Sequence, residues 1–371
     1  MEMKKLYNGV FNNKKVLVTG HTGFKGAWLS VWLLELGAEV VGISKDIPTN
    51  PSLFEALGLE KKMKHIVADI RDQQTIKELI HVEQPDFLFH LAAQAIVYKS
   101  YNDPVETMAT NVMGTVHVLE ALRTLSKPCA AVMITSDKCY ENVEWIWGYR
   151  ETDAVGGKDP YSASKGAAEL MIKTYIHSYF SKPDCAIKIA SVRAGNVIGG
   201  GDWAESRIVP DCMRSWSMNV TVEIRRPYAT RPWQHVLEPL SGYLLTAQAL
   251  SEGHTTVNGE AFNFGPGSDQ NKTVTELIDK LSFYWNAEGV KMYSVTKNQT
   301  FHEAGLLKLN CDKALFHLQW KPVLVFEETS SFTALWYKEF YHKPAEMYDF
   351  TIGQLQTYIH LAKTRALIWS N

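Results

Sequence analysis

Hydrophobic and polar residues occur in alternating blocks along the first 200 residues of the chain. Short apolar runs rich in valine and isoleucine are typical of buried strands, and longer segments between them have the composition of helices. The predicted strands cover 14–20, 39–44, 65–69, 86–93, 129–137 and 185–200. The predicted helices cover 27–37, 75–85, 103–125 and 161–179. This alternation predicts an α/β fold, a Rossmann-type doubly wound parallel sheet with helices on both faces.

The pattern loosens after about residue 193, where proline, arginine and tryptophan accumulate. Two further helices are predicted at 273–285 and 326–342. We expect a smaller substrate lobe, C-terminal and interleaved with the first unit. The predicted dinucleotide-binding domain takes residues 1–192 and about 234–265, and the predicted substrate lobe takes 193–233 and 266–371.

Charge and composition narrow the classes of function. The formal net charge of −2 shows no basic field, so we expect no nucleic-acid partner. The longest apolar stretch, 27–43, is interrupted by Glu35, Gly37 and Glu39, so no membrane span is expected. The N-terminal residues lack the apolar core of a secretory signal. Five scattered cysteines without a CxxC or Cys/His cluster predict no metal site and a reduced, cytoplasmic setting.

A glycine-rich turn, "TGHTGFKG" at 19–26, separates the first predicted strand from the first helix. Glycine permits positive φ and lets the backbone approach a pyrophosphate, which the helix N-terminus then faces. Lys25 either adds charge near the phosphates or is solvated. The ends of the third and fourth strands are expected to line the adenine and nicotinamide ends of the same dinucleotide. The predicted cofactor-binding residues are Gly20, Thr22, Gly23, Phe24, Lys25, Gly26, Asp69, Ile70, Leu91, Ala92, Ala93, Gln94, Tyr161 and Lys165.

The end of the second strand leaves the choice of dinucleotide open. NAD-binding units often carry an acid there, which binds the ribose hydroxyls. This chain has Ser44 and Lys45 before Asp46, and Lys45 would also suit a 2′-phosphate. The pattern alone therefore allows either NAD or NADP.

The stretch "DPYSASKG" at 159–166 places a tyrosine and a lysine one helical turn apart. Residues at i and i+4 share a helix face, so the ammonium of Lys165 can lie close to Tyr161. A phenol has an ordinary pKa of about 10, and a nearby cation favours the phenolate. We therefore expect Lys165 to lower the pKa of Tyr161, which would accept a proton from an alcohol as hydride leaves its carbon. Ser136, at the end of the fifth strand, can bind the same oxygen.

Together these motifs resemble the extended short-chain dehydrogenase/reductase family, from about Lys14 to the C-terminal region. "TSDKCYEN" at 135–142 matches the point where sugar-nucleotide 4,6-dehydratases of that family carry their elimination residues. Members that act on dTDP-glucose usually have an Asp-Glu pair, whereas this chain has Asp137-Lys138. With the segments 193–211 and 230–243, the chain is similar to members that act on CDP-glucose. Asn310 departs from the family, which has an acid there, so no role is carried over.

The resemblance implies a bound NAD and a lyase reaction that converts CDP-D-glucose to CDP-4-keto-6-deoxy-D-glucose. It implies Tyr161, Lys165 and Ser136 for oxidation at C4, Asp137 as the acid at C6, and Lys138 as the base at C5. For the diphosphate it implies Arg231, with Asn196 and Arg207 as further substrate contacts. Other nearby arginines are Arg193, Arg225 and Arg226. It also implies a role in deoxysugar and lipopolysaccharide O-antigen precursor biosynthesis, and a homodimer or dimer of dimers paired through 103–125 and 161–179.

Three alternatives stay open at this point. The first is a dTDP- or GDP-sugar 4,6-dehydratase, because no spacing identifies the base. The second is a nucleotide-sugar 4-epimerase, which has no need for Asp137 and Lys138. The third is a dinucleotide sensor without catalysis, which would need none of these residues.

Overall fold

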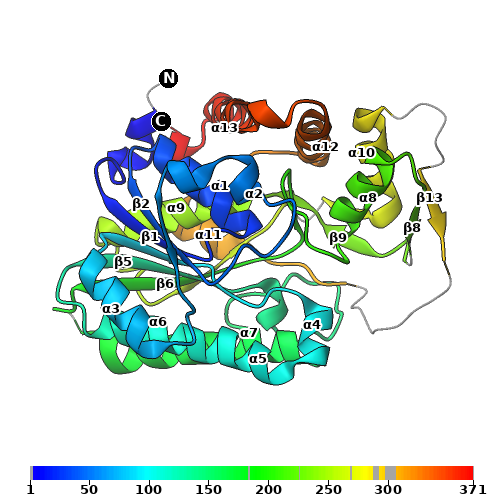
Figure 1. Cartoon of the computed structure of the whole chain (residues 1–371). Helices are drawn as coiled ribbons and strands as arrows, with labels where there is room; N and C mark the ends of the chain where they lie inside the picture. Colours follow the sequence, from blue (N-terminus) through cyan, green and yellow to red (C-terminus); the bar gives the residue numbers. More distant parts are fainter. Residues whose placement is uncertain are drawn as a thin grey trace.

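The computed structural model describes residues 3–182, 184–224, 226–267, 270–286, 292–296 and 306–370. A seven-stranded parallel sheet forms its centre, in the order β11-β6-β5-β4-β1-β2-β3 (Figure 1). The strands are β1 (Lys15–Thr19), β2 (Glu39–Ser44), β3 (Lys64–Val67), β4 (Phe87–His90), β5 (Cys129–Ile134), β6 (Ile187–Ala194) and β11 (Ala261–Phe264). The chain order reverses between β1 and β4, which makes the carboxyl edge there the expected ligand crevice. The predicted fold class is confirmed.

Helices cover both faces of this sheet (Figure 1). On one face lie α3 (Gln73–Glu83), α4 (Val97–Asn102), α5 (Pro104–Met108), α6 (Gly114–Arg123) and α7 (Pro160–Tyr175). On the other lie α1 (Phe24–Glu35), α2 (Leu53–Ala56), α9 (Leu237–Ser251), α11 (Asp312–Leu318), α12 (Phe326–His342) and α13 (Met347–Thr364). Short helical turns are η1 (Met3–Gly9), η2 (Leu59–Lys61), η3 (Ala109–Met113), η4 (Asp137–Cys139), η5 (Ile176–Phe180), η6 (Pro344–Glu346) and η7 (Ile368–Ser370).

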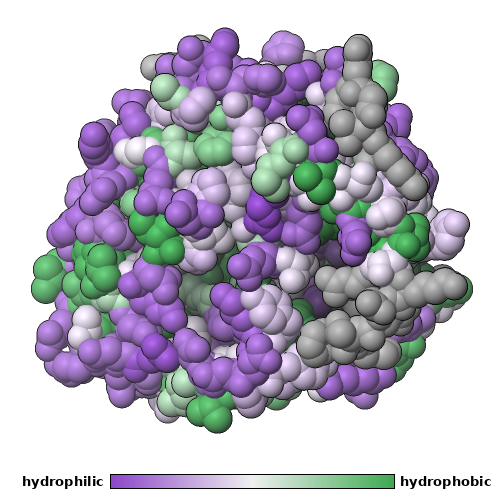
Figure 2. Space-filling view, turned by 45° about the vertical axis from the view of Figure 1, so that its right-hand side comes forward, coloured by the Kyte–Doolittle hydropathy of each residue, from purple (hydrophilic) through white to green (hydrophobic). Residues whose placement is uncertain are grey.

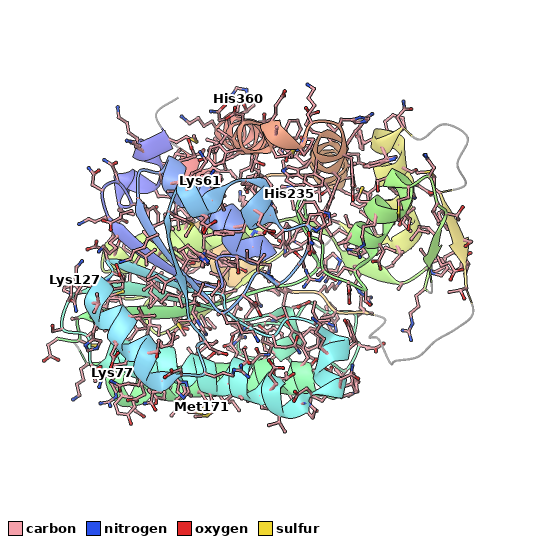
Figure 3. The ribbon with its side chains drawn as sticks, viewed as in Figure 1. Lys61, Lys77, Lys127, Met171, His235 and His360 are labelled. Carbon is pink, nitrogen blue, oxygen red and sulfur yellow. The ribbon has the colours of Figure 1, made fainter. Side chains whose placement is uncertain are left out.

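Side chains of successive strand residues pack on opposite faces of the sheet, in two separate hydrophobic cores. In β1, Leu17 packs in the core under α3, α6 and α7, whereas Val16 and Val18 join the larger core under α1 and α9. Because both faces are covered, β1 and β5 are apolar almost throughout, as parallel strands usually are. His235 is buried beside the ring of Trp28, whereas Lys61 and His360 are exposed (Figure 3).

A smaller region lies beyond the carboxyl edge of the sheet, at the right of Figure 1. It contains α8 (Ile208–Ser217), α10 (Val274–Trp285), β8 (Val222–Ile224), β9 (Thr230–Pro232), β12 (Asn271–Thr273) and β13 (Tyr293–Val295). Two-residue strands β7 (Val197–Ile198) and β10 (Gln234–His235) pair beside it. Our division into two units stays a prediction. In the structure α13, assigned to the second unit, packs on α1 through an edge contact between Trp32 and Tyr358.

The structure differs from the sequence expectations at several places. Strand β11 and helices α8 and α11 were not predicted, and the helix predicted at 161–179 ends in the π-helical turn η5. The helix predicted at 103–125 is divided into α5, the π-helical turn η3 and α6. The strand predicted at 185–200 ends at Ala194, because Asn196 adopts a left-handed φ of +53° and turns the chain. Helices α9 and α13 were not predicted, and nearly every residue of α9 is buried, so it shows no polar face. Within the described ranges no helix is both long and apolar enough to cross a membrane.

A buried carboxylate joins the C-terminal segment to the helix over the sheet. Glu238, in the first turn of α9, accepts hydrogen bonds from the backbone N–H groups of Val323 and Leu324 at 2.6 to 3.1 Å. The hydroxyl of Tyr358 on α13 donates to the same carboxylate at 3.1 Å. Burial raises the pKa of Glu238 to about 7, although these three donors oppose the rise.

We expect this carboxyl to make stability depend on pH. Its folded-state pKa lies above its ordinary value of 4.5, so its contribution is complete below that value and is lost as pH rises through about 7. The difference amounts to roughly 3 kcal/mol. As pH rises from 5 to 8, the thermal unfolding midpoint of the native chain should fall. The midpoint of Glu238→Gln, which cannot ionise at this position, should fall less over the same range. A control, Glu327→Gln at an exposed ion pair with Lys280, should keep the native pH dependence. Identical pH dependence in Glu238→Gln would contradict this account.

Candidate functional site

The glycine turn packs backbone against backbone. Gly20 has a φ of +77°, and a Cβ there would lie 2.7 Å from the backbone nitrogen of Ala92. A Cβ on Gly26 would lie 2.1 Å from the carbonyl oxygen of Gly20. Gly23 is the N-cap of α1, and no side chain caps that helix start. The first N–H groups of α1, including those of Phe24 and Lys25, are therefore arranged as a cradle that fits a pyrophosphate.

Hydrogen bonds join this turn to the end of β2. Thr22 donates from Oγ1 to the carbonyl oxygen of Asp46 at 2.7 Å. The ring of His21 lies 3.0 Å from Ser44 Oγ and 2.7 Å from His65 Nδ1. Burial lowers the pKa of His21 to about 4, so this imidazole is neutral at pH 7. Sequence reasoning missed His21, although its place inside the glycine turn is visible in the motif.

Asp69 and Ile70, which follow β3, have surroundings that differ from each other. Asp69 forms a bidentate pair with Arg71, which holds the pKa of that carboxyl below its ordinary value. The side chain of Ile70 is buried against α6, where a Cβ on Gly114 would lie 2.5 Å from Ile70 Cδ1. The carbonyl oxygen of Ile70 lies 2.9 Å from His117 Nδ1. The Ile70 side chain thus serves packing, and its contact with a cofactor stays a prediction.

The segment after β4 runs along the same edge. Leu91 donates its N–H to the carbonyl oxygen of Thr19, and Ala92 donates to Thr19 Oγ1. Beyond Ala93, the backbone of Gln94 makes two hydrogen bonds with the side chain of Asn111, at 2.8 and 3.0 Å. Asn111 also donates to Ser164 Oγ, next to Lys165. Asn111 was missed from the sequence and connects the predicted nicotinamide side with α7.

Ser136, Asp137 and Lys138 follow β5 directly. Ser136 Oγ donates to Asp137 Oδ1 at 2.9 Å and accepts the N–H of Lys138 at 3.3 Å. The carboxylate of Asp137 is buried against the backbone of Gly195, where a Cβ would lie 1.9 Å from Asp137 Oδ2. Lys138 is half-buried beside them. The three predicted residues therefore form one turn at the carboxyl edge of the sheet.

The tyrosine and lysine project from α7 toward this turn. Asp159 caps the helix, and Lys165 Nζ lies 6.0 Å from the ring centroid of Tyr161. Burial raises the pKa of Tyr161 to about 12, although a hydrogen bond with Ser136 lowers it. Burial also lowers the pKa of Lys165 to about 8. The net shift is opposite to the lowering that we predicted, because desolvation of the phenol outweighs the hydrogen bond with Ser136 and the charge of Arg207.

A pocket opens between this turn and the smaller region. Its lining includes Asp137, Gly195, Asn196, Gln234 and Lys308. Figure 2 shows a recess near the middle of a largely hydrophilic face. The pocket brings the predicted contact Asn196 within the same site as Asp137.

Two predicted arginines have partners in the structure. Arg207 precedes α8 and pairs with Asp202 at 2.8 Å, which raises its pKa, and its charge also acts on Tyr161. Arg231, on β9, donates from Nη1 to the carbonyl oxygen of Thr230 at 2.9 Å. Arg225 lies outside the described residues.

Cations dominate the middle of the site. Lys25 projects from α1, and burial together with the charges of Arg207 and Lys165 lowers its pKa to about 8. Asp137 and Asp202 oppose this effect. Lowered pKa values of buried lysines indicate a site that favours anionic ligands, because such ligands restore the charged form.

A buried ion pair lies directly beneath the site. Glu169, on α7, accepts from Arg193 Nε at 2.9 Å and Nη2 at 2.7 Å. It also accepts hydrogen bonds from Thr135 on the strand end and from Ser191 on β6. Arg193 donates to Tyr140 as well, so it is a structural residue rather than a substrate ligand.

Comparisons with known proteins agree with this geometry. The family model described as GDP-mannose 4,6 dehydratase matches residues 17–332. The chain belongs to this dehydratase family. It is 48% identical to CDP-glucose 4,6-dehydratase of Salmonella typhimurium, over 88% of this chain and 91% of that protein. The predicted resemblance to extended short-chain dehydrogenases/reductases is confirmed.

Solved structures of more distant proteins share the fold of this family. A dTDP-glucose 4,6-dehydratase from Streptomyces venezuelae, crystallised with NAD, aligns with a TM-score of 0.74 and 22% identity. It covers 88% of this chain and 97% of that one. A UDP-glucose 4-epimerase from Stenotrophomonas maltophila with bound NAD aligns with a TM-score of 0.75 and 22% identity, over 89% and 99% of the two chains.

We expect the pair Glu169–Arg193 to be critical for stability. Glu169→Gln leaves a buried guanidinium without its counter-charge, which costs about 3–5 kcal/mol in the free energy of unfolding. Glu327→Gln breaks an exposed pair with Lys280 and should cost less than about 1 kcal/mol. Urea unfolding of both variants measures the difference. Equal, small losses would show that the buried pair carries no such stability.

Proposed function

We propose that this protein is an NAD-dependent hydro-lyase that converts CDP-D-glucose to CDP-4-keto-6-deoxy-D-glucose and water. The observation that carries the proposal is the 48% identity, over 88% of the chain, to a CDP-glucose 4,6-dehydratase. The cluster of Ser136, Asp137, Lys138, Tyr161 and Lys165 at the carboxyl edge supports the same reaction type. NAD suits the uncapped glycine turn of α1.

Oxidation at C4 needs a base for the hydroxyl proton. Tyr161 accepts this proton as the phenolate, and Ser136, bonded to Tyr161, orients the C4 oxygen. NAD held at the glycine turn of α1 would supply the hydride acceptor for C4 and the hydride donor for C6, so the overall reaction would have no net redox change. Because burial raises the pKa of Tyr161 to about 12, the phenolate requires positive charge nearby, which Lys165 and Arg207 supply.

Elimination follows because a C4 ketone makes the C5 proton acidic. Lys138 accepts the C5 proton, and Asp137, in its protonated form, donates its proton to the C6 hydroxyl, which leaves as water. The C5–C6 double bond then takes the hydride at C6 and the proton from Lys138 at C5. The C4 proton on Tyr161 restores Asp137 through Ser136, which contacts both side chains. The two side chains are adjacent in one turn, which lets them act on neighbouring carbon atoms.

Cationic and amide groups are proposed to hold the nucleotide diphosphate. Asn196 and Arg207 lie between β6 and α8, where the chain passes from the sheet to the smaller region, and Arg231 lies on β9 of that region. Arginine suits a diphosphate because its planar fork binds two oxygens at once. Asn196 and Asp137 line the same pocket, so the sugar would lie between diphosphate and catalytic turn.

We also propose that the protein is a homodimer, or a dimer of such dimers. Val105, Met113 and Leu170 are 77%, 48% and 53% exposed, and they lie on α5, η3 and α7. An apolar hollow between these elements is lined by Met108, Val112 and Ala167 among others. Large exposed apolar patches commonly mark interfaces, and a two-fold axis would pair these helices with their copies. Sedimentation velocity at micromolar concentration tests it, and a monomer would contradict it.

We propose a cytoplasmic location and a role in supplying deoxysugar precursors, including those of O-antigen. The five cysteines are free, and three of them are buried, which suits a reducing compartment. A 4-keto-6-deoxy sugar nucleotide is a precursor because its ketone accepts further reduction or amination.

The substrate assignment is tested with the purified protein, NAD and separate CDP-, dTDP-, GDP- and UDP-glucose or mannose substrates. We expect loss of one water, measured by mass, from CDP-glucose at a rate at least about 100-fold above the others. Dehydration of a different nucleotide sugar would contradict the cytidine assignment. Epimer formation without water loss would favour the epimerase, and no turnover at all would favour the sensor.

The role of Lys138 is tested by Lys138→Met. Removing a general base costs about 10²- to 10⁴-fold in turnover. We expect C4 oxidation in a single turnover to persist, because it uses Tyr161, whereas deuterium exchange at C5 in D₂O should stop. Lys173→Met, on the exposed side of α7, is the control and should keep both steps. Retained C5 exchange in Lys138→Met would exclude Lys138 as the base.

A further inference from the structure

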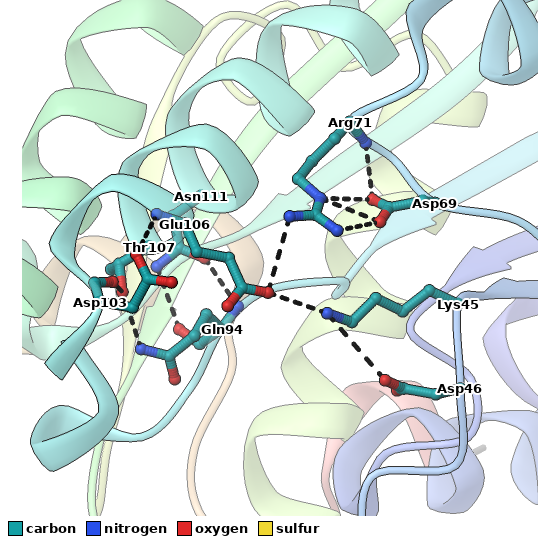
Figure 4. A network of polar contacts seen from close by, with 9 residues as sticks. All are labelled: Lys45, Asp46, Asp69, Arg71, Gln94, Asp103, Glu106, Thr107 and Asn111. Carbon is teal, nitrogen blue, oxygen red and sulfur yellow. Dashed lines mark hydrogen bonds and ion pairs between the residues drawn. The ribbon is translucent and has the colours of Figure 1, made fainter.

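Five charged side chains gather where β2 and β3 end and α5 begins (Figure 4). We call this group the rim cluster. Its members are Lys45, Asp46, Asp69, Arg71 and Glu106. The cluster lies at the carboxyl edge of the sheet, on the side of β1 away from the catalytic turn. Three carboxylates and two cations give it a net charge of −1.

Glu106 contacts both cations of the rim cluster. Its Oε1 lies 3.1 Å from Lys45 Nζ and 3.6 Å from Arg71 Nη1. Asp69 occupies the other side of the Arg71 guanidinium with a bidentate pair, and Asp46 lies 4.0 Å from Lys45. Glu106 is thus the one carboxylate of the rim cluster that joins the two cations.

The position of Glu106 is fixed by the start of its helix. Asp103 caps α5, and its Oδ1 accepts the N–H of Glu106 at 2.8 Å. The next residue, Thr107, accepts a hydrogen bond from Gln94, which follows β4. The helix that carries Glu106 is therefore anchored to the segment predicted to line the cofactor.

The end of β2 is where a doubly wound sheet distinguishes its dinucleotides. An acid there binds the 2′-hydroxyl of the adenosine ribose, whereas a nearby basic side chain binds the 2′-phosphate of NADP. Lys45 and Arg71 have the charge that a 2′-phosphate needs, but both are already paired with acids. A phosphate monoester carries about −1.5 to −2 charges at pH 7, which the net negative rim cluster repels.

We propose that Glu106 excludes the 2′-phosphate and so sets a preference for NAD over NADP. This inference rests on the proposed function, because it assumes the adenosine ribose at this edge. Each exposed pair contributes little by itself, since the three side chains are 36 to 42% exposed. The selectivity comes from the sum: Glu106 adds a negative charge and engages both cations that would otherwise meet the phosphate.

The test compares Glu106→Gln with the native chain in equilibrium binding of NAD⁺ and NADP⁺ by calorimetry, after removal of copurified nucleotide. Glutamine keeps the shape and removes the charge. We expect the Kd for NADP⁺ to fall about tenfold, and the Kd for NAD⁺ to change less than about threefold. The increase in affinity for NADP⁺ should be smaller in 0.5 M salt, which screens these charges. Glu327→Gln, which breaks an unrelated surface pair, should change neither Kd.

A second variant identifies the mechanism. Lys45→Met combined with Glu106→Gln should lose most of the gain for NADP⁺, because the freed cation is gone. An unchanged Kd for NADP⁺ in Glu106→Gln, or a gain that persists without Lys45, would overturn the inference. A native chain that prefers NADP⁺ would also overturn it, while dehydration of CDP-glucose supported by NAD would leave the proposed function standing. A native chain that binds neither dinucleotide would overturn both.

Discussion

The carboxylate of Glu169 lies at the junction of the three elements that carry the site. It belongs to α7, one turn beyond Lys165 and two beyond Tyr161, and it binds Arg193 on β6 and Thr135 beside Ser136. Tyr161 and Ser136 come from different elements, α7 and the turn after β5, and their hydrogen bond exists only while helix and strand end keep this relative position. A buried pair of this kind contributes little net stability against an apolar replacement, but breaking it on one side is costly. The role of this pair is to hold α7 in position against the end of β5.

Desolvation explains most of the chemistry at the sheet edge. Burial lowers the pKa values of Lys25 and Lys165 to about 8 and raises that of Tyr161 to about 12. All three shifts disfavour the charged forms. An anionic substrate and a cofactor with a positive ring reverse that balance, since each opposite charge in a low-dielectric site restores the ionised partner.

Local patterns predicted a large part of this arrangement. The alternation of strands and helices, the glycine turn and the Tyr161–Lys165 spacing each depend on residues close in sequence, and the structure has them where they were expected. Asn111 and Glu169 were missed because they act across the fold: Asn111 reaches Ser164, 53 positions away. The pKa of Tyr161 was predicted in the wrong direction, because the depth of burial cannot be inferred from helical spacing. Helix α9 was missed because burial on all sides leaves no polar stripe.

The central claim is that the hydride removed from C4 stays in the site and returns to C6 of the same sugar. A crossover experiment tests it most directly. CDP-glucose with deuterium at C4, and carrying ¹³C, is mixed with unlabelled substrate, and the product is examined by mass spectrometry and NMR. The account predicts deuterium at C6 of the ¹³C-labelled product alone, with none in the unlabelled product. Deuterium in the unlabelled product, in released dinucleotide or in solvent would contradict it.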